Sequence, residues 1–143
     1  MDAASDRSGL PSIRTLLLVD ALFEFAVAAA LLGFAGTLGD WLGVGTPICV
    51  VGGVIFAAAG VALAAMWRSY DPDPAAVQAL AFANIAGGVA GWLAFAIAWS
   101  FFEPGGRAVL GTASDVFIAL GVVELLALRD QRRTTDAAPG AAA

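Results

Sequence analysis

Four acidic residues lie inside long apolar stretches of this sequence, where an ionisable side chain can do chemistry. They are Asp20, Glu24, Asp115 and Glu124. An ionised acid at the centre of a membrane helix costs about 2.5–3.5 kcal/mol on insertion scales, so such residues normally face the interior of a bundle. A carboxyl group in a low dielectric also tends to take up a proton. These acids are therefore candidates for holding a proton or a cation.

Three of these acids and one amide are expected to meet in one polar cluster. Asp20 and Glu24 are four residues apart, so they share one helix face. Asn84 and Glu124 fall at a similar depth, counted from the same side of the membrane. The four residues predict an intramembrane site for a proton, a cation or a small ligand. The competing interpretation is purely structural: the acids are neutral and form hydrogen bonds that hold the helices together, with Asn84 as a partner for Glu24. This is called the glue interpretation below.

Glu124 has a further structural interpretation, because it lies close to the end of its apolar stretch. An arginine at the inner interface could reach it by extending its side chain along the helix. The candidates for this ion pair are Arg14, Arg68 and Arg129.

The outer half of the predicted bundle carries two other groups of interest. Asp115 points about 180° away from Glu124, and Thr112 lies one turn before it, so the two either satisfy one another or line an outer vestibule. Three aromatic residues share one sector of a helix, namely Trp92, Phe95 and Trp99. Such a sector predicts either an aromatic cavity for an organic cation or helix packing with an interfacial anchor.

The composition of the chain indicates which elements must position these residues. Of the 143 residues, 60% are hydrophobic and only 13% are charged. A water-soluble domain of this size cannot bury that much apolar surface, so a soluble enzyme, a disordered chain and a nucleic-acid binder are excluded. The sequence has no histidine, which removes histidine-ligated haem, the commonest zinc sites and histidine-based triads. No metal, cofactor or catalytic residue is expected.

Four segments are long and apolar enough to cross a bilayer as helices. They span residues 13–36, 47–67, 75–101 and 107–128. Thr46-Pro47 and Asp73-Pro74 each pair an N-cap residue with a proline in the first helical turn. Residues 1–12 form a short cytoplasmic segment, and residues 129–143 are expected to form a disordered cytoplasmic tail. The predicted fold is an all-α integral membrane four-helix bundle.

The arginines predict the orientation of this bundle. Six of them fall on one side of the predicted membrane, namely Arg7, Arg14, Arg68, Arg129, Arg132 and Arg133. Only Arg107 falls on the other side. The bias places both termini in the cytoplasm, with the protein in the cell (cytoplasmic) membrane.

Small residues at four-residue spacing indicate close contacts between helices. The third span carries Ala83, Gly87 and Gly91 in this pattern. The pattern serves either packing within the chain or a homodimer face. The expected partners are the lipid bilayer and a second copy or another membrane protein, with no nucleic acid.

Several short motifs resemble a family of small four-helix integral membrane proteins found in actinobacteria and related bacteria. They are Arg14 with Val19-Asp20-Ala21, the run Leu38-Gly39-Asp40-Trp41-Leu42-Gly43, Asn84 with Trp92, and Gly111. The resemblance covers Arg14 to Arg129 and implies a fold and a location, without an activity. In that family an amide is commoner near the position of Glu124 and a small residue is common at Glu24, so the resemblance implies no shared role for these glutamates.

Two functions remain open from the sequence. One is a non-enzymatic membrane protein that acts through assembly or interaction, with its acids as glue. The other is a proton- or cation-coupled small-molecule transporter that uses the helix face of Asp20 and Glu24. An intramembrane enzyme is disfavoured, because no nucleophile and base form a recognisable pair.

Overall fold

Every regular element of the described chain is helical. The computed structural model describes residues 10–69 and 71–136. Its long helices are α1 (Ile13–Gly33), α3 (Thr46–Arg68), α4 (Pro74–Ile97) and α5 (Pro104–Asp136), and its short ones are α2 (Ala35–Leu42) and the 3-10 helix η1 (Trp99–Phe101). All four long helices are long and apolar enough to cross a membrane. The predicted all-α four-helix fold is confirmed, and by length and composition the chain is a multi-pass membrane protein.

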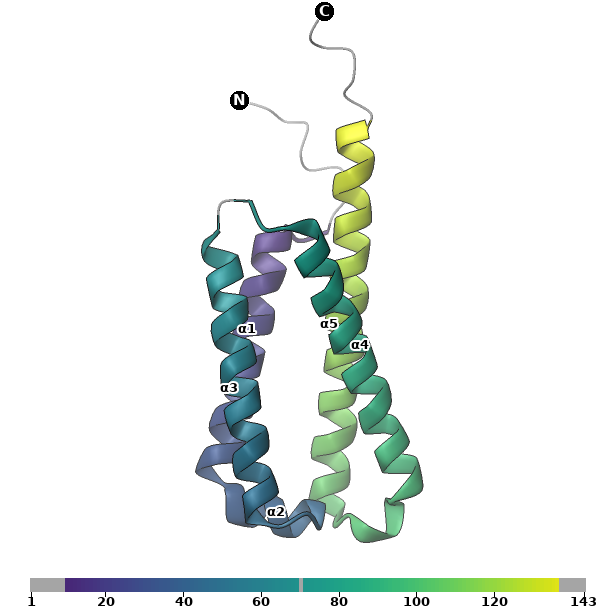
Figure 1. The fold of residues 1–143 in the computed structure, drawn as a ribbon. Helices are drawn as coiled ribbons and strands as arrows, with labels where there is room; N and C mark the ends of the chain where they lie inside the picture. The colour runs from purple at the N-terminus through teal and green to yellow at the C-terminus, as the bar shows by residue number, and fades with distance from the viewer. Residues whose placement is uncertain (1–9, 70, 137–143) are drawn as a thin grey trace, which may run out of the picture.

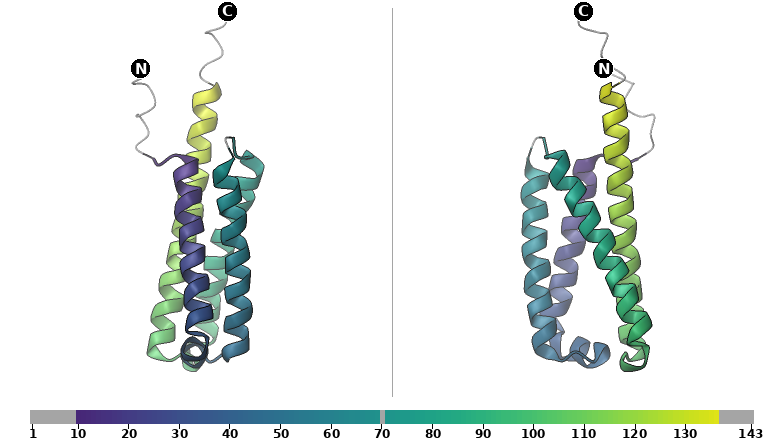
Figure 2. Two further views of the ribbon diagram at one scale, coloured as in Figure 1. Left: turned by 90° about the vertical axis from the view of Figure 1, so that its left-hand side faces the viewer. Right: turned by 45° about the vertical axis from the view of Figure 1, so that its right-hand side comes forward.

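The long helices associate as two antiparallel pairs (Figure 1). α1 packs along α3, and α4 packs along α5, while far fewer contacts join one pair to the other. α1 begins and α5 ends at one end of the bundle, called the termini end below. α2 lies across the opposite end, called the α2 end, and is seen nearly along its axis in Figure 2.

The ends of three helices differ from the sequence-based prediction. α1 ends at Gly33, and the chain continues through Phe34 into α2, which was not predicted. The third span ends at Ile97, because η1 takes up the residues up to Phe101. α5 begins three residues earlier than predicted, at Pro104. The second span, predicted as 47–67, is correct to within one residue at each end.

The disordered tail predicted for residues 129–143 is wrong over its first eight positions. α5 continues to Asp136, through a segment with three arginines and one glutamine, residue types that are good helix formers. Residues 1–9 and 137–143 lie outside the described part of the chain. Of the predicted N-terminal segment, the structure describes Leu10 to Ser12, and Ser12 caps α1 by accepting a hydrogen bond from the Thr15 backbone at 3.2 Å.

The two proline-containing helix starts differ in detail. Asp73 caps α4 as predicted, because its Oδ1 accepts a hydrogen bond from the Ala75 backbone N–H at 2.9 Å. Thr46, predicted as a cap, is already the first residue of α3, and Gly45 precedes it with φ of 77°. Glycine adopts this conformation without steric cost.

The two helix pairs are joined at the α2 end by backbone contacts. The Trp41 carbonyl of α2 accepts a hydrogen bond from the Glu103 backbone N–H at 2.9 Å. A β-carbon on Gly106 would collide with that same carbonyl, so the start of α5 must carry a glycine there. This contact fixes α2 against the connection between α4 and α5.

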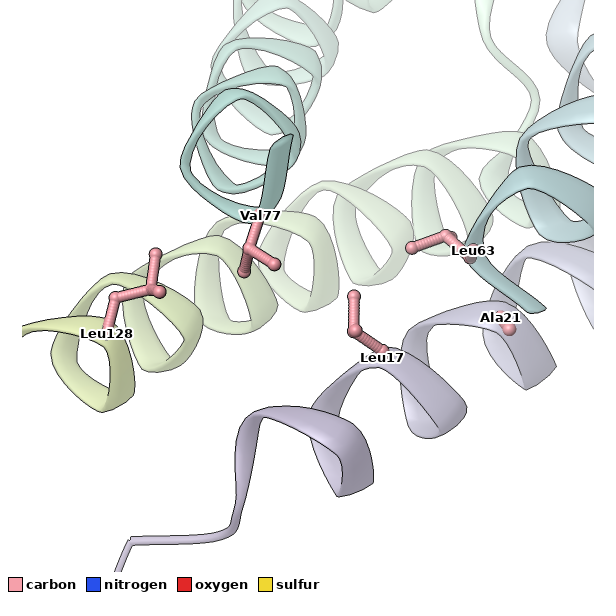
Figure 3. Packing of buried hydrophobic residues seen from close by; sticks show 5 residues of the cluster. All are labelled: Leu17, Ala21, Leu63, Val77 and Leu128. Carbon is pink, nitrogen blue, oxygen red and sulfur yellow. The ribbon is translucent and has the colours of Figure 1, made fainter. Parts of the chain in front are cut away.

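At the termini end the two pairs meet through an aliphatic layer. Its buried members come from all four long helices: Leu17, Ala21, Leu63, Val77 and Leu128. Figure 3 shows Leu17, Leu63 and Val77 pointing inward from three different helices. Burying several large aliphatic side chains in this way packs the helix ends against each other.

Candidate functional site

Asn84 lies at the centre of a polar cluster formed by three helices. Its side-chain amide donates one hydrogen bond to Asp20 Oδ2 on α1 at 2.9 Å and another to Glu124 Oε2 on α5 at 3.4 Å. Asp20 and Glu124 are 0% exposed. Three of the residues that the sequence analysis grouped by depth are therefore in direct contact. Together with Glu24 they are called the acid cluster below.

The periodicity of each helix accounts for this convergence. On α1 the buried face includes Leu17, Asp20, Glu24 and Ala28, at spacings of three and four residues. On α4 it runs through Val77, Ala81, Asn84 and Gly88. The acids and the amide thus occupy positions that would be apolar in a purely hydrophobic bundle.

Close approach of α4 and α5 brings Asn84 within reach of Glu124. A β-carbon on Gly121 would collide with the Ala81 carbonyl oxygen and would lie 2.7 Å from Ile85 Cγ1. A β-carbon on Gly88 would lie 2.6 Å from Ile118 Cγ1. These two glycines let the backbones touch on either side of the Asn84 level, as small residues do between membrane helices.

The predicted contact spacing on the third span is correct for only part of its residues. Gly91 does pack on α5, where a β-carbon would collide with Ser114 Oγ. Gly87 faces open space, with nothing within 4 Å, and Ala83 is exposed. The packed stripe is instead formed by Ala81, Gly88 and Gly91.

Glu24 is buried without the partner that the sequence suggested. It is 4% exposed, and Asn84 donates to Asp20 and Glu124 instead of to Glu24. One buried oxygen on each acid of the cluster has no hydrogen-bond donor in the described chain: Asp20 Oδ1, Glu24 Oε2 and Glu124 Oε1. A buried acceptor left unsatisfied costs about 1–3 kcal/mol, so three in one cluster need an explanation.

No arginine of the described chain forms an ion pair with the acid cluster, so the predicted pairing of Glu124 is wrong. The candidates were Arg14, Arg68 and Arg129. Arg14 donates instead to the Trp67 carbonyl at 3.3 Å, and Arg129 is exposed and lines a hollow together with Gln78 of α4. The reason is that Glu124 is directed into the bundle, where a guanidinium group at a helix end cannot follow.

Two apolar layers flank the acid cluster along the bundle axis. The aliphatic layer lies on the termini side, since Leu17 precedes Asp20 by about a turn and Leu128 follows Glu124 by about a turn. Phe23 lies between Asp20 and Glu24 on α1, level with the acid cluster. Phe117, about two turns from Glu124 toward the α2 end of α5, contacts it at 5.3 Å between ring centroids, edge to face, and begins an aromatic layer. It also stacks on Phe56 of α3 at 5.8 Å.

A hollow opens at the termini end, beyond the aliphatic layer. It measures about 530 Å³, and its lining includes Ser12, Arg14, Asp71, Ala127 and Asp130. Ala127 lies one turn from Glu124, so about one layer of side chains, that of Leu17 and Leu128, separates the hollow from the acid cluster.

Asp115 and Thr112, which were predicted to act together in the outer half of the bundle, have different surroundings in the structure. Asp115 Oδ1 accepts a hydrogen bond from Trp92 Nε1 at 3.0 Å, so its partner is Trp92 and not Thr112. Thr112 lines an open apolar groove of about 410 Å³, together with residues such as Phe23 and Val27 of α1. Asp115 is not among the residues that line this groove.

The aromatic residues Trp92, Phe95 and Trp99 pack against one another. Their rings meet edge to face, with centroids 5.0 Å apart for Trp92 and Phe95 and 4.6 Å apart for Phe95 and Trp99. The guanidinium carbon of Arg107 lies 4.3 Å from the centre of the Trp99 ring. The contact at the Trp99 end of the row is thus made by a cation of the chain itself, and the three rings pack on one another.

Among the described residues, no group of three or more histidine, cysteine, aspartate or glutamate side chains is arranged to hold a metal ion. No family model matches this chain, and no curated protein and no solved structure matches it either. The site must therefore be interpreted from its own geometry.

Sequence reasoning did not identify the two apolar layers or their role in enclosing the cluster. Leu17, Leu63 and Leu128 are indistinguishable by type from the many lipid-facing residues around them. Phe23, Phe56 and Phe117 had a usable signal, because each lies near the midpoint of its span. Depth alone could have brought the three rings together.

Proposed function

We propose that this protein is a small membrane transporter that binds and releases protons at the acid cluster. The observation that supports this most is the set of three buried carboxyl oxygens that lack a donor among the described residues, on three acids that form no ion pair with a described arginine. Protons on the acids supply both the missing donors and the missing positive charge. Intramembrane acids in this setting commonly mark ion and proton pathways.

The glue interpretation explains only part of the cluster. It accounts for the two hydrogen bonds of Asn84, which join α1 to α5 through α4. It does not account for Glu24, which is buried one turn from Asp20 and receives no hydrogen bond on Oε2. A purely structural site would have no use for this third carboxyl group.

The surrounding geometry supports a carrier that opens to one side at a time. The aliphatic layer separates the cluster from the hollow at the termini end, and the stacked rings of Phe117 and Phe56 lie on its α2 side. A small rotation of one helix pair against the other would open one layer and leave the other in place. Because the two pairs share few contacts, such a rotation disturbs little packing.

We further infer that both termini are cytoplasmic and that the protein resides in the bacterial cytoplasmic membrane. The arginine bias supports this, since Arg107 is the one arginine of the described residues at the α2 end, whereas Arg14, Arg68, Arg129, Arg132 and Arg133 lie at the termini end. The resemblance to small four-helix membrane proteins of actinobacteria supports the same location.

Ion flux into liposomes tests the proposal. The protein is reconstituted into vesicles that contain a pH-sensitive dye, and either a sodium gradient or a potassium diffusion potential is imposed. We expect a pH change faster than in protein-free vesicles, reduced at least tenfold by Glu24→Gln and by Asp20→Asn. The matched control is Asp40→Asn, which changes an exposed acid on α2 and should leave the flux unchanged. Flux equal to that of empty vesicles under both gradients, or undiminished in Glu24→Gln, would show the proposal to be wrong.

Assembly in the membrane is a second candidate function, and one observation favours it. The outward face of α4 is lined by small exposed residues along its whole length: Ala76, Ala79, Ala83, Gly87, Ala90 and Ala94. Small faces of this kind let a second membrane helix approach closely. Replacing Gly87 by Leu should convert a dimer to a monomer in cross-linking experiments in the membrane, whereas unchanged cross-linking would exclude this face as the interface.

A further inference from the structure

A second hollow lies at the termini end, between the start of α4 and the end of α5. It measures about 260 Å³ and is lined by Gln78, Leu125, Leu128, Arg129, Arg132 and Arg133. It is called the arginine groove below. It is separate from the acid cluster, because Leu128 and the helix backbones lie between the two.

The arginine groove carries three positive charges and no negative one among its lining residues. Arg132 donates to Gln78 Oε1 at 3.3 Å, which holds its guanidinium group toward α4. Within the described chain, Arg129 and Arg133 form no hydrogen bond or ion pair. The neighbouring acid Asp130 lines the other hollow, with Arg14 and Asp71. The guanidinium groups of Arg129 and Arg133 are therefore available to an anion.

The length of α5 places these arginines at the level of lipid headgroups. The segment of α5 that is long and apolar enough to cross a membrane covers 30 residues, Pro104–Arg133. This corresponds to about 45 Å of helix. The hydrocarbon core of a bilayer is about 30 Å thick, so roughly 15 Å of this helix lies beyond it. Figure 1 shows α5 extending past the other helices at the termini end. The arginines occupy this last part.

The floor of the groove differs in chemistry from its rim. Leu125 lies one to two turns deeper than the arginines, Leu128 lies about one turn deeper than Arg132 and Arg133, and both face the same hollow. An occupant that matches both parts has an anionic head for the arginines and an apolar body for the leucines. Arginine binds phosphate oxygens through two parallel N–H groups, which favours a phosphate over a single carboxylate.

We propose that the arginine groove binds the phosphate headgroup of an anionic phospholipid, with the start of its acyl chain against Leu125 and Leu128. Basic pockets between membrane helices at the interface are suited to such headgroups. The bound lipid fills the wedge between the start of α4 and the end of α5. This inference does not depend on transport through the acid cluster.

Titration of the detergent-solubilised protein with defined lipids tests the inference. Native mass spectrometry measures the occupancy of phosphatidylglycerol and, separately, of phosphatidylcholine. We expect phosphatidylglycerol to bind more tightly, and each of Arg129→Gln and Arg132→Gln to weaken it about fivefold, so that the double variant loses roughly 25-fold. Phosphatidylcholine binding should not change.

The matched control is Arg68→Gln, which removes the same charge at the same end of the bundle but outside the groove. It should leave phosphatidylglycerol binding within twofold of the unmodified protein. Equal binding of the two lipids, or an equal loss in Arg68→Gln and Arg132→Gln, would overturn the proposal. Inorganic phosphate is added as a competitor at the same concentrations, and displacement of the lipid by it would show that the groove recognises free phosphate instead.

Discussion

Contacts within each helix pair differ in kind from contacts between the two pairs. Within α4 and α5, Gly88 and Gly121 bring backbone and side chain so close that a methyl group does not fit. Within α1 and α3, a β-carbon on Gly53 would lie 2.7 Å from Leu32. Between the long helices of the two pairs, the contacts are made by side chains: the Asn84 hydrogen bonds, the Phe117 rings and the aliphatic layer. The backbone contact between the pairs lies at the α2 end, where α2 meets the start of α5.

This difference indicates where the molecule can move. Backbone contacts through glycine leave no slack, because a small displacement creates either a collision or a gap. Side chains can change rotamer and re-form contacts at a modest cost. We therefore expect each pair to move as a unit. The acid cluster lies at the interface between the two units, which is called the seam below.

The largest effect on stability should come from Gly121→Ala. The new methyl group collides with the Ala81 carbonyl and forces α4 away from α5, at a cost of about 1–3 kcal/mol. The control is Gly87→Ala on the open face of α4, which should change stability by less than about 0.5 kcal/mol. Free energies of unfolding in mixed micelles measure both, and equal values would contradict the claim that glycine contacts make the pair rigid.

The next largest effect should come from breaking the polar link between the pairs. Asn84→Leu removes both hydrogen bonds and leaves Asp20 Oδ2 and Glu124 Oε2 without a donor, which should cost about 1–2 kcal/mol. A double-mutant cycle with Asp20→Leu should give a coupling energy of about 0.6 kcal/mol, typical of hydrogen bonds between membrane helices. A coupling energy of zero would mean that this bond does not hold the seam.

The aromatic layer should contribute less than the polar link. Phe117→Leu keeps most of the apolar volume but loses the ring contacts with Phe23 and Phe56, which should cost about 0.5–1.5 kcal/mol. The control is Phe82→Leu, a ring on the lipid-facing side of α4 that is 53% exposed. If the two variants unfold at the same denaturant concentration, the rings at the seam are no more important than rings facing lipid.

The smallest effect should come from the exposed polar contact within the α4–α5 pair. Asp115→Asn keeps an oxygen that accepts from Trp92 Nε1, so stability should be unchanged, whereas Asp115→Ala should cost about 0.5–1 kcal/mol. Trp92 fluorescence should shift only in the alanine variant. A large loss of stability in Asp115→Asn would show that the charge of Asp115 is needed. The contact would then resemble the buried acid cluster between the pairs, and not an ordinary exposed hydrogen bond.

The sequence predicted the depth of each site residue but not its hydrogen-bond partner. Asp20, Asn84 and Glu124 were grouped by depth, and depth needs only the position of each residue along its own span. Their actual bonds depend on how far each helix is rotated, and for that reason Asn84 bonds to Glu124 instead of Glu24. The partner of Asp115 was missed for the same reason, since Trp92 lies 23 residues away on another helix.

The sequence by itself determined the four long apolar helices, the asymmetry of the arginines and the level of each acid in the bundle. These properties depend on hydropathy and on the rise of a helix, both of which are local. Only the tertiary structure decided which helices pair, which glycines touch, which carboxyl oxygens lack a donor and that α5 continues past the bundle. These depend on the fit of side chains from distant segments, because close packing and hydrogen bonds, and not apolar burial, discriminate between helix pairings in lipid.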